Sequence, residues 1–345
     1  MKKWQPCILL LSMFFLVTFL LPVTPFVSAQ EKPIELKLAH MFPVNSPSDL
    51  HVKAWADKIA SDSNGRLTIR IFPVGTLVPP PELYDAAAKG TADLAFGFRY
   101  GPKNQPIGVT FPFILGAPDT MTASRIYDDI WKAFPKEMSA EWSDVRILWI
   151  TPAMVQWMET IPPVRSVADM KGLQIRVPSK EAADFIKDMG GTPVFMSSAD
   201  MAMALEKGTV DGVISMPAAV EDNKLGTNLR YAINFEIGVP TPIYCTMNKD
   251  SYADLPDDLK KVIDDSCEWG KQGNLKYWSA ALDTALEYFK EAGVEVINLS
   301  PQEKEKWTTI LAKARDRVGK QLDEKGFPGT KIVQFIREKE KQYAQ

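Results

Sequence analysis

Histidine and cysteine are scarce in this chain of 345 residues. His40 and His51 are the only histidines in the sequence, and Cys7, Cys245 and Cys267 are the only cysteines. A histidine-based catalytic triad or a His-rich metal site therefore has almost no material, and no Cys–His cluster has the spacing that binds zinc. The sequence predicts no metal site and no cofactor, and an enzyme is an unfavoured alternative.

Clusters of basic residues and long apolar runs are also missing from most of the chain. The 40 Lys and Arg residues are outnumbered by 43 Asp and Glu residues, which gives a formal net charge of −3. A mildly acidic chain of this kind lacks the electrostatic footprint of a nucleic-acid-binding protein. Beyond the first residues, no apolar run approaches the ~20 residues of a membrane-spanning helix. We therefore expect no nucleic-acid partner and no stable membrane insertion of the mature protein.

Residues 1–29 have the pattern of a secretory signal peptide. Two lysines precede an apolar run over residues 8–21, and small residues at 27–29 offer a cleavage site. An uncleaved membrane anchor is the alternative, but the apolar run is short for a spanning helix. We expect a mature protein of residues 30–345, exported to the periplasm and long enough for two domains of ordinary size.

Short strands alternate with helices along the mature chain. Alternating apolar residues predict strands at 34–39, 67–72, 92–96, 145–150, 173–177, 193–195 and 210–214. Helical spacing and stop signals predict helices at 48–63, 81–89, 180–189 and 199–207. Such alternation predicts an α/β fold built from parallel layers.

A short repeat runs through this alternation. Lys-Gly-Thr-Ala-Asp at residues 89–93 recurs as Lys-Gly-Thr-Val-Asp at 207–211, each time where a predicted helix meets a strand. An Ile-Arg pair that ends in Arg70 or Arg176 lies upstream of each copy, shortly before a proline. Two matched junctions in the same order predict two lobes that are built alike.

The last third of the chain is predicted to be helical. Residues 257–292 contain no proline, and their apolar residues recur at helical spacing, which predicts a long helix that bridges two lobes or, alternatively, a helical hairpin. Further helices are predicted at 301–322 and 331–343. Cys267 lies in the long segment, and in an oxidising compartment it could pair with Cys245 or remain one of two buried thiols.

Arg176 is the most informative single residue. Residues 173–177 alternate as a strand does, and Pro178 ends it because proline has no N–H to donate. A guanidinium at that point has no carboxylate among its near neighbours in the sequence, and its planar fork suits a carboxylate held by two parallel hydrogen bonds. The partner is either a ligand or a distant Asp or Glu of the protein itself.

Several motifs, taken in order, resemble those of the solute-binding subunits of tripartite ATP-independent periplasmic (TRAP) transporters of the C4-dicarboxylate-binding type. Each is weak alone, but their order and spacing from about Ile34 to the last helix are specific. They are Ser-Asn-Gly-Arg-Leu at 63–67, Phe-Pro-Val-Gly-Thr-Leu at 72–77, the two repeats above, and Val-Ala-Asp-Met-Lys-Gly-Leu-Gln-Ile-Arg-Val-Pro at 167–178.

The resemblance implies the two-lobed fold of periplasmic binding proteins, with an interdomain cleft and a long lobe-bridging helix. Lobe I is expected to comprise residues 30–151 plus about 238–270, and lobe II residues 152–237 plus about 271–345. The resemblance also implies that Arg176 binds the carboxylate of a small organic acid. The closed, liganded protein would then deliver its ligand to an ion-driven TRAP membrane permease.

The chain departs from its relatives in ways that bear on the ligand. A second arginine found in many relatives is missing from 154–158, where Gln156 and Trp157 lie, and the usual polar residues after Asp-Gly are replaced by a segment that includes Ser215 and Met216. Each hydroxyl group of a sugar acid that found no hydrogen-bond partner in such a closed cleft would cost ~1–3 kcal/mol of binding free energy. Further residues expected at the rim are His40, Phe98, Arg99 and Phe195.

The predicted ligand is therefore an apolar or aromatic monocarboxylate, such as an indole- or phenyl-substituted acid, because methionine and aromatic walls suit a flat apolar ring. A sugar acid or a C4-dicarboxylate is the alternative ligand. A sensor subunit that presents its ligand to a receptor is the alternative role, and the sequence does not separate it from transport.

Overall fold

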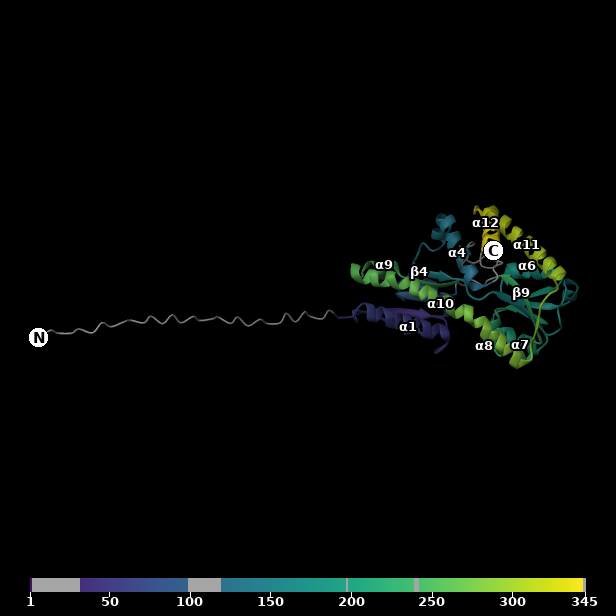
Figure 1. Ribbon diagram of the computed structural model, residues 1–345, viewed down its shortest axis with the longest axis horizontal. Helices are drawn as coiled ribbons and strands as arrows, with labels where there is room; N and C mark the ends of the chain where they lie inside the picture. Colours follow the sequence, from purple (N-terminus) through teal and green to yellow (C-terminus); the bar gives the residue numbers. More distant parts are fainter. Residues whose placement is uncertain (2–31, 99–118, 197, 239–241, 344–345) are drawn as a thin grey trace. The chain divides into compact units, whose positions relative to one another are not determined.

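Two β-sheets, both covered by helices, form the framework of the protein (Figure 1). The computed structural model describes Met1 and residues 32–98, 119–196, 198–238 and 242–343. Pro33–Gln345 is one compact unit. The predicted signal peptide lies, apart from Met1, outside the described residues and stays a prediction. Within the described parts of the chain, no helix is both long and apolar enough to cross a membrane.

The first sheet has five strands in the order β2-β1-β3-β10-β4. Next to the edge strand β2 (Leu67–Phe72), β1 (Ile34–His40) runs parallel to both β2 and β3 (Leu94–Phe98). β10 (Ile243–Met247) runs antiparallel between β3 and β4 (Arg146–Thr151).

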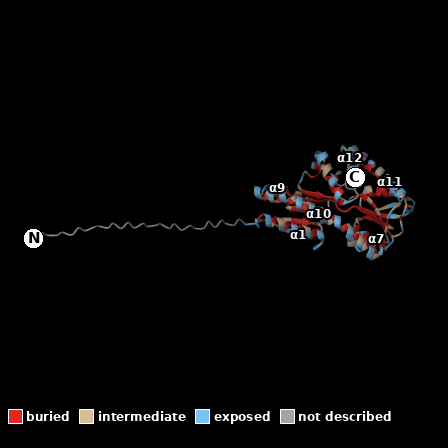
Figure 2. Ribbon diagram, viewed as in Figure 1, coloured by how far each residue is buried: buried red, intermediate tan, exposed pale blue. Residues whose placement is uncertain are grey.

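The second sheet has six strands in the order β11-β9-β5-β8-β6-β7. The strands are β5 (Gln156–Thr160), β6 (Gln174–Val177), β7 (Thr192–Phe195), β8 (Gly212–Ser215), β9 (Tyr231–Gly238) and β11 (Glu295–Ile297). β6 runs parallel to β7 and β8, whereas β5 runs antiparallel to β8 and β9. Buried residues concentrate on these strands and on the inward sides of the helices (Figure 2).

The predicted α/β fold is confirmed, but its layers are not parallel throughout, because β5 and β10 run antiparallel to their neighbours. The chain passes from β4 in the first sheet to β5 in the second, and it returns from β9 to β10. A strand that arrives directly from the other sheet begins at the end where the neighbouring strands finish, so it runs antiparallel to those strands. We propose these two passages, near residues 151 and 238, as the boundaries between the lobes.

The helices cover both faces of the sheets. They are α1 (Pro47–Asp62), α2 (Leu83–Ala88), α4 (Thr120–Ala133), α5 (Pro135–Glu141), α6 (Lys180–Asp188), α7 (Met201–Glu206), α8 (Pro217–Asp222), α9 (Lys249–Ala253), α10 (Asp257–Ala292), α11 (Pro301–Glu324) and α12 (Gly329–Tyr343). In Figure 1, α6 and α11 lie on one side of the second sheet, and α7 and α8 on the other. The side chains of Ser46, Ser179 and Ser300 cap the N-termini of α1, α6 and α11, as short polar residues do.

The long C-terminal helix is a single element. α10 runs unbroken for 36 residues, so the alternative of a helical hairpin is wrong. It packs on α1 and β4 of the first sheet and on α8 and β11 of the second. Cys267 on α10 and the buried Cys245 on β10 are both free thiols.

Two glycines let α10 approach the first sheet closely. A Cβ added at Gly270 would lie 2.6 Å from the ring of Trp149, and one at Gly273 would overlap the ring of His51. His51 Nε2 hydrogen-bonds the carbonyl oxygen of Gly270 at 2.9 Å, and its ring stacks on Trp269. Burial lowers the pKa of His51.

The repeated segments hold equivalent places in the two sheets, but the Ile-Arg pairs do not. Residues 89–93 lead into β3 and residues 207–211 into β8, next to the interior strands β1 and β6 respectively. Arg176 lies on the interior strand β6, whereas Arg70 lies exposed on the edge strand β2, the counterpart of β7. The predicted correspondence of Arg70 and Arg176 is therefore wrong.

Candidate functional site

Arg176 is held at the end of β6 by backbone carbonyl groups. Its side chain is 5% exposed. Nε donates a hydrogen bond to the carbonyl oxygen of Met196 at 3.1 Å, and Nη1 donates to that of Ile214 at 2.8 Å. Within the described residues, no carboxylate forms a salt bridge with this guanidinium and Nη2 has no hydrogen-bond partner. Two of its three nitrogens are thus fixed by neutral acceptors, which orient the group without neutralising it.

Glu159 on β5 is the titratable group that acts on Arg176. It is fully buried, and its Oε2 accepts a hydrogen bond from Ser215 Oγ at 2.9 Å. Its Oε1 is buried without a partner among the described residues. Burial raises the pKa of Glu159 to about 8, although Ser215 and Arg176 act to lower it. Burial also lowers the pKa of Arg176 to about 10, and Glu159 opposes that shift.

The predicted second-lobe residues gather where several strands of the second sheet begin or end. Trp157 pairs with Ser215 across β5 and β8, and Gln156 pairs with Gly238 of β9. Trp157 and Gln156 are buried, and Met216, half-buried, follows β8 directly. Because β6 and β8 end where the antiparallel β5 begins, these four residues and Arg176 lie near one another at the same ends of the strands.

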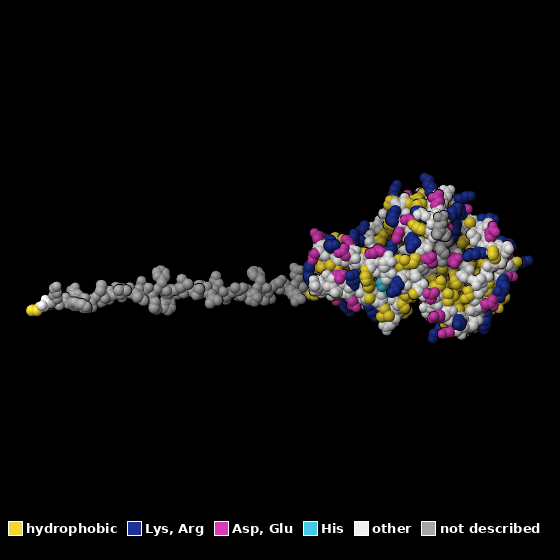
Figure 3. All heavy atoms as spheres, viewed as in Figure 1, with side chains coloured by type: hydrophobic (Ala, Val, Ile, Leu, Met, Phe, Trp, Pro, Cys, Tyr) yellow, Lys and Arg dark blue, Asp and Glu magenta, His cyan; other side chains and the backbone are white. Residues whose placement is uncertain are grey.

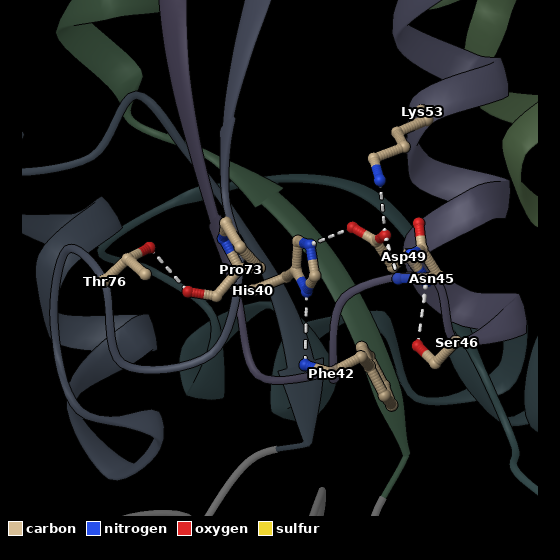
Figure 4. A network of polar contacts seen from close by, with 8 residues as sticks. All are labelled: His40, Phe42, Asn45, Ser46, Asp49, Lys53, Pro73 and Thr76. Carbon is tan, nitrogen blue, oxygen red and sulfur yellow. Dashed lines mark hydrogen bonds and ion pairs between the residues drawn. The ribbon is translucent and has the colours of Figure 1, made fainter.

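His40 and Phe98 lie at the ends of β1 and β3 in the first sheet. The His40 ring is buried between Asp49, whose Oδ1 is 3.1 Å from Nε2, and the backbone N–H of Phe42, which donates to Nδ1 at 3.1 Å (Figure 4). Lys53 Nζ lies 2.7 Å from the other oxygen of Asp49. Both ring nitrogens are thus used within the protein, and a contact of His40 with a ligand stays a prediction.

A row of packed aromatic rings begins at Phe42, whose backbone N–H contacts His40. The Phe42 ring packs against Phe96, at 5.2 Å between centroids, and against Phe98, at 6.1 Å. Phe98 in turn meets Trp278 of α10 edge-on at 6.2 Å. Phe96 is fully buried, so it belongs to the core, whereas Phe98 is half-buried.

The remaining rim residues fall in different surroundings. Phe195, the last residue of β7, is 61% exposed. Arg99 lies outside the described residues. Trp149 on β4 packs edge-on against Trp55 at 4.8 Å in the core.

Sequence reasoning missed Glu159 and Trp278. Glu159 follows Trp157 with the period of a strand, but β5 was not among the predicted strands, so its inward direction could not be inferred. Trp278 was read only as part of a long helix. Its indole nitrogen is buried without a hydrogen-bond partner among the described residues.

Positive and negative side chains are mixed on the visible face, and the described residues contain no cluster of metal ligands. On the face shown in Figure 3, Lys and Arg side chains are interspersed with Asp and Glu side chains. No group of three or more His, Cys, Asp or Glu side chains of the described residues could hold a metal ion.

Several known proteins are similar to this chain in sequence or in structure. The C4-dicarboxylate-binding protein DctB of Bacillus subtilis is 24% identical over 289 residues, 81% of this chain and 80% of its own. A solved TRAP solute-binding protein from a marine metagenome, specific for aromatic acid ligands and in complex with 3-hydroxybenzoate, has a TM-score of 0.80 and 23% identity, and covers 91% of this chain and 99% of its own. One from Rhodoferax ferrireducens T118, in complex with copurified benzoate, has a TM-score of 0.74 and 22% identity, with 90% and 98% covered.

The model of the family described as bacterial extracellular solute-binding protein, family 7, matches residues 38–321. The match spans most of the chain, and the solved relatives have its two-lobed α/β fold. The protein therefore belongs to the bacterial extracellular solute-binding protein family 7, and its predicted membership of the TRAP solute-binding proteins is confirmed.

Proposed function

We propose that this solute-binding protein captures an aromatic monocarboxylate and that Arg176 is its anchor. The arrangement of Arg176 supports this most directly. The guanidinium is buried, two nitrogens are oriented by carbonyl groups, and no described carboxylate pairs with it. A buried charge without a counter-ion is costly, and the carboxylate of a ligand would supply the missing charge.

The surroundings favour a ring as the rest of the ligand. Trp157 and Met216 lie near Arg176 at the same ends of the strands in the second sheet, and we assign Gln156 and Ser215 the few polar contacts. Phe98 would supply a wall from the first lobe, with Phe195 and Arg99 at the rim. Flat apolar rings pack well against methionine and aromatic side chains.

Two similar solved structures contain 3-hydroxybenzoate and benzoate, which fits a ligand of this class. A C4-dicarboxylate is the second candidate, because one relative is named for it. A second ligand carboxylate would call for a second cation, whereas the residues assigned beside Arg176, which are Trp157, Met216, Gln156 and Ser215, carry no charge. The aromatic monocarboxylate is therefore favoured.

The role follows from the family. Following export to the periplasm and removal of residues 1–29, the protein would close on its ligand and deliver it to a TRAP permease. The ligand shifts the equilibrium towards the closed form only to the extent that it binds the closed form more tightly than the open form. Presentation to a receptor is the alternative role, and loss of aryl-acid uptake on deletion of the permease would decide for transport.

A thermal-shift screen tests the ligand class. The panel contains benzoate, 3-hydroxybenzoate, phenylacetate and indole-3-acetate, with succinate and gluconate as the competing classes. A ligand at ~1,000 times its dissociation constant adds about 4 kcal/mol of stability, a shift of several degrees. We expect that shift with aryl acids. Stabilisation by succinate or gluconate alone would overturn the proposal.

A further inference from the structure

Glu159, Ser215 and Met216 form a short polar chain beneath Arg176. Ser215 Oγ lies 2.9 Å from Glu159 Oε2 and 3.3 Å from the carbonyl oxygen of Met216. With a proton on Oε2, the carboxyl group donates to the serine oxygen, whose own proton is then free for the Met216 carbonyl. Both distances suit this direction, so the geometry accommodates a protonated Glu159 whose proton is hydrogen-bonded to Ser215.

The ionised form of Glu159 fits the same surroundings poorly. The residue is fully buried, Oε1 has no partner among the described residues, and no described Lys, Arg or His forms a salt bridge with it. A buried carboxylate with one hydrogen bond and no ion pair costs several kcal/mol, and such groups take up a proton instead. Burial is the largest influence on its pKa, which is raised to about 8.

We propose that Glu159 is a specificity-determining residue that stays protonated behind Arg176 and so preserves the positive charge that one ligand carboxylate needs. This inference rests on the proposed function. An ionised Glu159 would cancel the charge of the guanidinium and repel the incoming anion. The protonated form leaves a net charge of one, which matches a monocarboxylate.

The other charged groups nearby do not account for this effect. Arg176 on β6 and Ser215 on β8 are the described groups that act on Glu159, apart from its own backbone N–H, and on β9 its neighbour is Ala232. Glu221 and Asp222 of α8, with Glu287 and Glu291 of α10, form a separate acidic set. Tyr277 of α10 responds to Asp222 and Glu221, and its pKa is raised to about 12 by burial above all.

Calorimetric titration with benzoate between pH 6.5 and pH 9 tests the inference, because this window stays below the pKa of Arg176. We expect wild-type affinity to fall about tenfold by pH 9, since about one tenth of Glu159 would remain protonated one unit above its pKa. Glu159→Gln, which is neutral at every pH, should bind benzoate at pH 9 as it does at pH 6.5. Ser215→Ala should move the fall to higher pH, because its hydroxyl hydrogen-bonds the ionised form more strongly.

A second measurement needs no ligand. The unfolded carboxyl group titrates near 4.5 and the folded one near 8, so the wild type loses stability relative to Glu159→Gln as pH rises between these values. A wild type whose affinity is constant to pH 9, or a stability difference that does not change with pH, would overturn the inference. If benzoate does not bind at pH 6.5, the proposed ligand is wrong, and the stability difference alone decides the state of Glu159. If Glu159→Gln does not fold, the wild-type and Ser215→Ala titrations decide.

Discussion

Asp93 and Asp211 make the same pair of hydrogen bonds in the two sheets. Oδ2 of Asp93 accepts from the backbone N–H of Lys37 on β1 at 2.7 Å, and Oδ2 of Asp211 accepts from that of Gln174 on β6 at 2.7 Å. The backbone N–H of each aspartate donates to the carbonyl oxygen of the same strand residue. The aspartate of each repeat thus ties an incoming strand to the neighbouring strand, β1 or β6.

Replacing either aspartate with alanine should lower stability and leave the ligand site intact. Each carboxylate satisfies a backbone N–H, and loss of such a bond costs about 1–2 kcal/mol. Asp93→Ala should cost more than Asp211→Ala, because Asp93 also accepts from Ser251 Oγ at 2.6 Å. Urea unfolding measures the loss. Ligand affinity that falls in Asp211→Ala without a loss of stability would mean that this residue serves the ligand.

Gly270→Ala should destabilise the protein even though alanine favours helices. The substitution gains at most about 1 kcal/mol in helix propensity. A methyl group there would lie 2.6 Å from the Trp149 ring, and overpacking of this kind costs about 1–3 kcal/mol. Ser279→Ala, at an exposed position of the same helix, is the matched control and should change stability by less than about 0.5 kcal/mol. Thermal unfolding of both variants gives the comparison.

His40 should remain neutral at pH 7 and resist protonation in the folded state. Burial lowers its pKa below the ordinary 6.5, and this effect outweighs the attraction of Asp49. A lowered folded pKa contributes stability above about pH 6.5, and this stability is lost as pH falls below that value. NMR titration of the two histidines, assigned with a His51→Gln variant, measures the value directly. A His40 pKa above 6.5 would contradict the burial argument.

The local patterns of the sequence predicted much of the fold. These patterns are hydrophobic periodicity, the missing N–H of proline and helix capping, all of which act over a few residues. They predicted the strand that ends at Pro178, the helix over 257–292 and the aspartate repeats. The direction of β5 and β10 escaped prediction because it depends on which sheet a strand joins. The mistaken correspondence of Arg70 and Arg176 has the same origin, since only strand order tells an edge strand from an interior one.

Only part of the candidate site was predicted, because the rest depends on contacts between residues far apart in the sequence. Arg176 stands out because a cation at the end of an apolar strand is unusual within a short stretch of sequence. Glu159 does not stand out, because its burial depends on three strands that pack together far from one another in the chain. The hydrogen bond from Ser215 to Glu159 joins residues 56 positions apart, so the neutral group behind Arg176 becomes visible only in the folded protein.

The role of Arg176 is the central claim, and isothermal titration calorimetry of Arg176→Ala with an aryl acid tests it most directly. Arg70→Ala removes the same charge from an exposed edge strand and serves as the control. Loss of a buried charged partner costs about 2–5 kcal/mol, so Arg176→Ala should weaken binding by at least about 30-fold. Arg70→Ala should bind as the wild type does. Wild-type affinity in a folded Arg176→Ala protein would contradict the account.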